Sequence, residues 1–243
     1  QVLEWFKSLI GFPMAGMGLL VSGSSAAAIT ALAAARQRAT ASRGWDVRTT
    51  GMQLPARMLV YMTPEAHGCH QKAVELLGIG NAQIRTVPTD DALRMLPNAL
   101  DAMLAEDLAV GALPVAVVAS AGTVNTGAID PLDEIADVCA RHGVWLHVDG
   151  AYGAPAVITD DYRSQLAPIA RADSVAIDAH KWMYVPVDAG VVLVRDVRAM
   201  RDAFSLVPAY LRIDGDAQGV QGPPWFSEYG AEQTRPFRAL KIW

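Results

Sequence analysis

The sequence has no excess of positive charge and very little cysteine. Its 243 residues carry a formal net charge of −5, which gives no reason to expect nucleic acid or an anionic membrane as a partner. Only Cys69 and Cys139 are present, so no disulfide framework is implied and a reducing, cytoplasmic setting is expected. Hydrophobic residues make up 52%, as is typical of one large globular domain with a sizeable core.

Two common nucleotide-binding patterns are also missing. "GMG" at 16–18 lacks the third glycine of a dinucleotide fingerprint, and the chain has no P-loop. "HGCH" at 67–70 offers three potential zinc ligands on one turn. Three ligands so close together rarely complete a tetrahedron, and no second His/Cys group of suitable spacing follows. We therefore expect no metal site.

One stretch, from Ser8 to Ala35, has no charged residue and is long enough to span a bilayer. Its middle, "GMGLLVSGSS", is rich in Gly and Ser, and the basic residues that precede the apolar run of a signal sequence are missing. We interpret it as a buried loop followed by a buried helix. The chain starts at Gln1 without a methionine and stops at Trp243 within a helical pattern, so we expect a piece of something longer.

Apolar, β-prone runs alternate with helical patterns along the chain. Strands that are apolar on both faces and alternate with helices predict an α/β domain with a mainly parallel sheet, covered on both sides. A Gly/Pro-rich stretch at 213–226 predicts a mobile surface loop. The predicted strands are 57–62, 82–88, 113–120, 144–149, 174–178 and 190–196, and the predicted helices are 70–78, 90–107 with an interruption at Pro97, and 130–143.

Three polar residues, His67, Asp149 and Lys181, each follow a predicted strand, and in such folds ligands gather at the carboxyl ends of strands. A Schiff-base lysine and a buried carboxylate are what pyridoxal phosphate (PLP) requires. The lysine holds the aldehyde, and the carboxylate keeps the pyridine nitrogen protonated. Taken singly, Lys181 is explained as a solvated surface charge and Asp149 as a cap or turn residue. The small residues around both weaken these alternatives.

A phosphate-binding site, called the phosphate seat below, is predicted in "SGSSAAAITALAAAR" at 22–36. Gly and Ser donors stand directly before an Ala-rich helix, and the N-terminus of a helix binds a dianion well. An ordinary serine cap on a buried helix would explain this motif about as well if it stood alone.

Three motifs, "HVDGAYG", "DAHKW" and "RPFRALKIW", in this order and spacing, resemble the group II PLP-dependent amino acid decarboxylases, the family of aromatic-L-amino-acid decarboxylase. The resemblance runs from about Glu4 to Trp243. It implies the PLP-dependent transferase-like fold (fold type I), with 1–243 as the PLP-binding large domain, incomplete at both ends. The family's N-terminal segment and C-terminal small domain would then be absent. It also implies a homodimer, since the family borrows walls of its substrate pocket from a neighbouring subunit.

The resemblance also implies roles for single residues. Lys181 would form the internal aldimine with PLP, Asp149 would pair with the pyridine nitrogen, and His67 would stack on the ring. Tyr210, on a closing loop, would protonate the quinonoid carbon. The other implied cofactor contacts are Ser24 and Ser25 as the phosphate-binding pair, Thr123 near the cofactor, Ala151 beneath the ring, and Asp178 and His180 near the phosphate.

The implied reaction is decarboxylation of an L-amino acid, with an aromatic one favoured, to the amine and CO₂ through a quinonoid. Two alternatives stay open: an aldehyde synthase or carbon–carbon lyase on the same scaffold, and a catalytically inactive PLP-fold fragment. The chain departs from the family pattern in its cofactor shell. Ala26 and Ala28 replace polar residues, and Val124 replaces the second Thr of a "GTT" turn.

Overall fold

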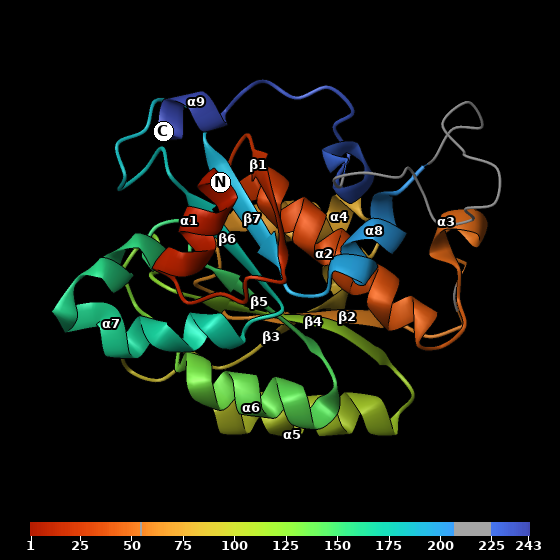
Figure 1. The fold of residues 1–243 in the computed structure, drawn as a ribbon. Helices are drawn as coiled ribbons and strands as arrows, with labels where there is room; N and C mark the ends of the chain where they lie inside the picture. The colour runs from red at the N-terminus through yellow and green to blue at the C-terminus, as the bar shows by residue number, and fades with distance from the viewer. Residues whose placement is uncertain (54, 207–224) are drawn as a thin grey trace.

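A twisted sheet runs through the middle of the computed structural model, which describes residues 1–53, 55–206 and 225–243 (Figure 1). In the described part of the chain the sheet has seven strands in the order β1-β7-β6-β5-β4-β2-β3. All strand pairs from β6 to β3 are parallel, whereas β7 is antiparallel to both β6 and β1. The strands are β1 (Met17–Val21), β2 (Met58–Met62), β3 (Ile84–Thr86), β4 (Leu113–Ser120), β5 (Trp145–Asp149), β6 (Ser174–Asp178) and β7 (Gly190–Val194).

Helices cover both faces of this sheet, as its fully buried central strands require. One face packs on α2 (Ser24–Ala41), α4 (Gly68–Leu76) and α8 (Val197–Phe204), and the other on α1 (Val2–Leu9), α5 (Pro97–Ala109) and α6 (Leu132–His142). The remaining elements are α3 (Val47–Thr50), α7 (Asp160–Leu166), α9 (Ala239–Ile242) and the short 3₁₀ helices Asn81–Gln83, Ala154–Ile158, Ala167–Arg171 and Phe226–Tyr229. The predicted mainly parallel α/β architecture is therefore confirmed.

Two predicted elements differ from the structure. The stretch interpreted as a buried loop contains β1, because its backbone groups pair with β7 from Met17↔Val194 to Val21↔Gly190. The helix predicted over 90–107 with an interruption at Pro97 instead begins at Pro97, which occupies the first turn. Proline is well suited to that turn, since it lacks the N–H that would have no partner there. Most of the surface loop predicted at 213–226 lies outside the described residues.

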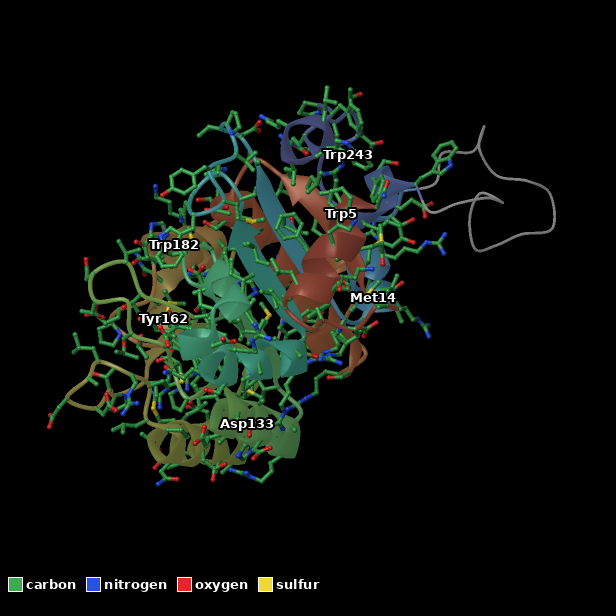
Figure 2. All side chains as sticks on the ribbon, turned by 60° about the vertical axis from the view of Figure 1, so that its left-hand side comes forward. Trp5, Met14, Asp133, Tyr162, Trp182 and Trp243 are labelled. Atoms are coloured by element: carbon green, nitrogen blue, oxygen red, sulfur yellow. The ribbon has the colours of Figure 1, made fainter. Side chains whose placement is uncertain are left out.

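The two described ends of the chain lie side by side. The ring centroids of Trp5 in α1 and Trp243 after α9 are 5.0 Å apart, and Figure 2 labels both. Within 1–53, 55–206 and 225–243, none of the helices is both long and apolar enough to cross a membrane.

Candidate functional site

Three polar residues end three neighbouring parallel strands. Ser120 ends β4, Asp149 ends β5 and Asp178 ends β6. Ser120 and Asp149 lie opposite each other in the β4–β5 pairing, and β5 and β6 are neighbours. Because parallel strands share a carboxyl edge, these side chains converge on one edge of the sheet, the place where α/β folds bind ligands.

Asp178 is the centre of the first polar cluster at this edge. Its buried Oδ2 accepts a hydrogen bond from the Ser24 hydroxyl at 2.9 Å and lies 3.0 Å from Lys181 Nζ. His180 Nε2 is 3.7 Å from the same oxygen. Asp178 Oδ1 is buried and has no hydrogen-bond partner among the described residues. The sequence-predicted residues Ser24, Asp178, His180 and Lys181 are thus brought together.

The N-terminus of α2 reaches this cluster because two glycines let the backbones approach. A Cβ on Gly190 would lie 2.4 Å from the Gly23 Cα, so only hydrogen fits there. Gly23 has φ +155° and precedes α2, and no described side chain caps the helix. A Cβ on Gly23 would lie 3.3 Å from His180 Cε1, which places the imidazole beside the free N–H groups of the first turn. Ser25 lies exposed in the same turn.

Asp149 forms the second polar group, on the neighbouring strand. Its Oδ1 accepts a hydrogen bond from the Ala151 N–H at 3.1 Å, and its Oδ2 lies 3.7 Å from His70 Nδ1. Burial by itself would raise the pKa of Asp149, but His70, the Ala151 N–H and the more distant charges of the site outweigh it and hold the pKa below its usual value. The carboxylate is therefore ionised at neutral pH despite being only 9% exposed.

A pocket lies between the two polar groups. Asp149, Lys181 and Ser24 line it together with three other residues predicted from the sequence, His67, Thr123 and Ala151. His67 is exposed and caps α4, accepting a hydrogen bond on Nδ1 from the Cys69 N–H at 3.2 Å. The Thr123 hydroxyl is held inside its own turn, 2.7 Å from the Thr126 hydroxyl and 3.1 Å from the Ala128 N–H, from which it accepts a hydrogen bond.

The pocket wall includes residues that the sequence argument did not single out. Glu65, Ser120 and Tyr152 line it, and the ring of Tyr152 packs edge-on against that of Trp182, with centroids 4.9 Å apart. Tyr152 follows Ala151 in "HVDGAYG", and Trp182 follows Lys181, so their proximity to assigned residues was the available signal.

The departures from the family pattern fall in different places. Ala28 is fully buried in the core and Ala26 is partly buried against it, whereas Val124 is 64% exposed and lines the pocket. Of these three, Val124 is the one that lines the pocket. Tyr210 lies outside the described residues.

The side chains that the structure brings together as possible metal ligands differ from those predicted in "HGCH". Ligand atoms of Cys69, His70 and Asp149 lie within 4.8 Å of one another, without His67. Burial, with a contribution from Asp149, raises the pKa of Cys69 to about 12, so its sulfur stays a thiol at neutral pH. A thiol is a poor metal ligand, because the thiolate is the form that coordinates.

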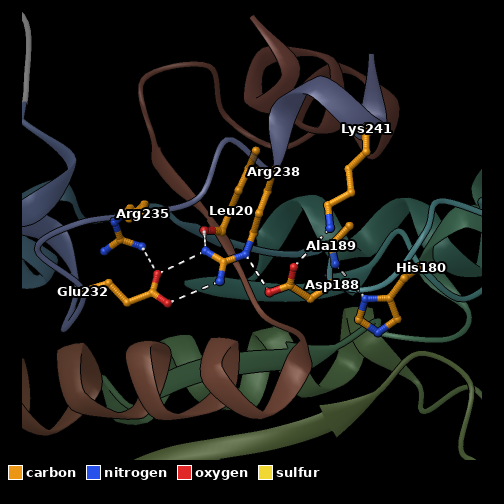
Figure 3. Close-up of polar contacts among 8 residues, drawn as sticks. All are labelled: Leu20, His180, Asp188, Ala189, Glu232, Arg235, Arg238 and Lys241. Carbon is orange, nitrogen blue, oxygen red and sulfur yellow. Dashed lines mark hydrogen bonds and ion pairs between the residues drawn. The ribbon is translucent and has the colours of Figure 1, made fainter.

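The loop that carries His180 and Lys181 is anchored from the far end of the chain (Figure 3). The buried Arg238 donates to Asp188 at 3.0 Å and to Glu232 at 3.2 Å, and Lys241 donates to Asp188 at 3.1 Å. The hydrogen bond from Lys241 and, after it, the one from Arg238 lower the pKa of Asp188 to about 2. The neighbouring Ala189 N–H donates to His180 Nδ1 at 2.9 Å. The ion pairs therefore hold the loop that orients His180.

The residues present fit PLP by their chemistry. The uncapped helix end and the Ser24 hydroxyl suit a phosphate, and the amine of Lys181 suits an aldehyde. The ionised Asp149 keeps Oδ2 without a hydrogen bond among the described residues, so this oxygen can accept one from a protonated ring nitrogen.

Comparison with known proteins places the chain in a family. Over 241 residues it is 40% identical to aromatic-L-amino-acid decarboxylase from Bacillus atrophaeus, covering 99% of this chain and 48% of that protein. The structure of TDC from Oryza sativa with PLP and tryptamine matches with a TM-score of 0.86 and 30% identity, over 99% of this chain and 50% of that one. The structure of 4-hydroxyphenylacetaldehyde synthase from Rhodiola rosea matches with a TM-score of 0.82 and 26% identity, over 99% and 48%. The chain thus spans about half the length of these relatives. Because the model of the pyridoxal-dependent decarboxylase conserved domain matches residues 1–243, the chain belongs to the pyridoxal-dependent decarboxylases.

Proposed function

We propose that residues 1–243 are the PLP-binding large domain of an enzyme that decarboxylates an L-amino acid to its amine and CO₂. The observation that carries the proposal is that Lys181 and Asp149, which follow or end adjacent parallel strands, line one pocket beside the N-terminus of α2. A cationic amine, a buried carboxylate and a phosphate seat are the three groups that PLP chemistry requires.

When bound, PLP supplies an aldehyde that condenses with amines and a ring that accepts electrons. Lys181 would hold the aldehyde carbon and release it to the amine of the substrate. Asp149 would keep a proton on the ring nitrogen, and His67 would cover one face of the ring and Ala151 the other. Ser24 and Ser25 would hold the phosphate, Asp178 and His180 would lie near it, and Thr123 would lie near the cofactor.

Borohydride reduction of the protein with bound PLP, followed by peptide mass mapping, tests the lysine directly. We expect a phosphopyridoxyl group on Lys181, whose amine lies in the site 3.0 Å from Asp178. Lys72, exposed on α4, and Lys241, paired with Asp188, serve as internal controls. An adduct on either of these instead of Lys181 would overturn the assignment. A folded protein that binds no PLP at all would favour the inactive-fragment alternative.

For the substrate we favour an aromatic L-amino acid. The support is the 40% identity to an aromatic-L-amino-acid decarboxylase and the structural match to a protein solved with tryptamine. The test is CO₂ release from each of the twenty amino acids by the complete protein. Turnover restricted to acidic or aliphatic amino acids would refute the aromatic preference but leave decarboxylation standing.

The alternative reaction on the same scaffold is oxidative formation of an aldehyde, which the likeness to 4-hydroxyphenylacetaldehyde synthase supports. Carbon–carbon cleavage is the third outcome of the same cofactor. We propose that Tyr210 decides between the first two by donating a proton to the substrate carbon after CO₂ leaves. Tyr210→Phe should bind PLP normally yet form little amine and, with dissolved O₂ as the oxidant and water for the hydrolysis, more aldehyde, ammonia and hydrogen peroxide. Amine formation at the parental rate would show that Tyr210 is not the donor.

We also propose that the working unit is a cytoplasmic homodimer. Large apolar side chains, Phe237, Leu240 and Trp243, are 67–74% exposed on and beside α9, as expected of a surface that another chain covers. Both cysteines are free and buried, in keeping with a reducing compartment. Light scattering of the complete protein is the check on assembly, and a fully active monomer would contradict the dimer.

A further inference from the structure

His70 in α4 lies beside the carboxylate of Asp149. The imidazole is 1% exposed, and its Nδ1 is 3.7 Å from Asp149 Oδ2. That distance is too long for a hydrogen bond but close enough for a strong electrostatic interaction in a buried place. The Ala151 N–H holds the other carboxylate oxygen, so His70 is the side chain that flanks the oxygen left for a ligand.

The hydrogen on His70 can be assigned from its partners. Nδ1 lies 3.1 Å from the carbonyl oxygen of His67, which can only accept a hydrogen bond, and 3.6 Å from Cys69 Sγ, a weak donor and acceptor. The shorter contact to the carbonyl oxygen assigns a proton to Nδ1, and the positive end of this N–H bond lies beside Asp149. The same contact ties His70 to the backbone of His67, the residue at the start of α4 that lines the pocket.

A second buried histidine, His147, packs against His70. Burial lowers the pKa of His147 to about 3, so its ring is neutral at physiological pH. The Ser174 hydroxyl accepts from Trp145 Nε1 at 2.7 Å and lies 2.8 Å from His147 Nδ1, to which it can donate its own hydrogen.

The rings of His147 and His70 pack against each other, with centroids 5.4 Å apart. Nε2 of His147 and Nε2 of His70 are both buried without a hydrogen-bond partner in the described residues, so neither bonds the other directly. A water between them would supply both nitrogens with a partner. The packing of the two rings limits the rotation of His70.

From these contacts we infer that His70 is a positioning residue for Asp149. Its Nδ1–H stabilises the ionised carboxylate, aims Oδ2 into the pocket, and couples Asp149 to the turn that carries His67. Its loss would let the carboxylate take up a proton or rotate, and the ring nitrogen of bound PLP would lose its hydrogen-bond acceptor. The inference rests on the proposed role of Asp149.

The test reads the ring nitrogen itself. The protein is loaded with PLP labelled with ¹⁵N at that nitrogen, and its NMR shift reports whether it carries a proton. His70→Leu keeps the size but removes the N–H, and we expect the signal to move toward the unprotonated form. We also expect kcat to fall about tenfold, the effect of one pKa unit on the proton occupancy of Asp149 or the ring, at unchanged KM. His70→Asn places an amide N–H where Nδ1 was and should restore most of both values.

Two further variants separate positioning from folding. Val74→Ala removes packing from the same helix at a fully buried position and should leave the nitrogen signal unchanged. His70→Gln keeps a polar side chain but moves its donor away from the carboxylate, so it should resemble the Leu variant and serves if that one does not fold. A ring nitrogen equally protonated in the Gln or Leu variant and in the parent overturns the inference, as does an equal change in Val74→Ala.

A fourth variant, Asp149→Ala, distinguishes this inference from the proposed function. If it shifts the nitrogen signal and the His70 variants do not, Asp149 keeps its role and His70 has none. If it leaves the signal in place, the role of Asp149 fails and the role of His70 fails with it. In the protein without PLP, ¹⁵N NMR of His70 should show hydrogen on Nδ1, and hydrogen on Nε2 alone would refute the assigned tautomer.

Discussion

The ion pair of Lys181 and Asp178 makes a quantitative prediction about the protein without PLP. Lys181→Met removes the cation that lies 3.0 Å from Asp178 Oδ2 and leaves a carboxylate whose side chain is only 3% exposed. The Ser24 hydroxyl remains as its hydrogen-bond donor. We therefore expect Lys181, the lysine proposed to hold the cofactor, to stabilise the fold before any cofactor binds.

The magnitude follows from the distance and the exposure. Unit charges 3.0 Å apart attract by about 5.5 kcal/mol at an effective dielectric constant of about 20. The Lys181 side chain is 34% exposed, so solvent screening and lost rotamer freedom reduce the net contribution to about 2 kcal/mol. For a chain of this length that corresponds to a fall in Tm of about 4–8 °C.

A double-mutant cycle measured by urea unfolding is the assay. Asp178→Asn removes the charge but keeps an oxygen for Ser24, so adding Lys181→Met in that background should cost less than about 0.5 kcal/mol, the usual range for surface changes. Lys72→Met, at an exposed position, is the matched control and should be neutral. If Lys181→Met costs the same in the parent and in the Asp178→Asn background, the two groups are not coupled and the reasoning is refuted.

Three further predictions concern the supports of the site. Asp188→Asn should destabilise the protein at neutral pH. The pKa of Asp188 lies at about 2, below its ordinary 3.8, so the ionised carboxylate stabilises the folded protein fully above pH 3.8. The difference in free energy of unfolding between parent and variant, measured with urea, should therefore shrink as the pH falls toward 2. A difference that stays constant over this range would contradict the prediction. Gly153→Ala places a Cβ 2.1 Å from the Ala121 carbonyl oxygen and should weaken PLP binding in a spectroscopic titration. Gly68→Ala, with open space around its Cβ, is the control and should bind PLP as the parent does. Equal PLP affinities of the two variants would show that the clash with Ala121 does not affect the pocket. Asp149→Ala should keep PLP through the phosphate seat yet lose most of its turnover, and near-parental turnover would count against its role.

Most of the sheet was predictable because its strands are locally distinct. β2, β4, β5 and β6 are continuous apolar runs bounded by polar or small residues, and each was located to within one residue at either end. β1 was missed because "MGLLV" lies among Gly and Ser, and only its pairing with β7 makes it a strand. Such long-range pairing leaves no local pattern.

The residues of the candidate site were predictable as far as they follow strands or match motifs. Lys181, Asp149 and Ser24 were singled out in this way, and the structure brings them to one pocket, while their roles stay predictions. His70 was considered only as a metal ligand, since "HGCH" does not reveal that α4 turns it toward β5. Arg238 lies far along the chain from Asp188, and an ion pair between them has no signature in spacing.

The pairing of β1 with β7 also determines the order in which the molecule can be completed during synthesis. Val21 can pair with Gly190 only after Gly190 has been translated. At a synthesis rate of roughly 5–20 residues per second, the interval between the two residues lasts on the order of ten seconds or more. Over this interval β1, in the middle of the uncharged stretch from Ser8 to Ala35, lacks the strand with which it pairs. The β1 end of the sheet, beside the residues proposed to hold the phosphate, is therefore completed late, and until then β1 leaves unpaired backbone groups open to other chains.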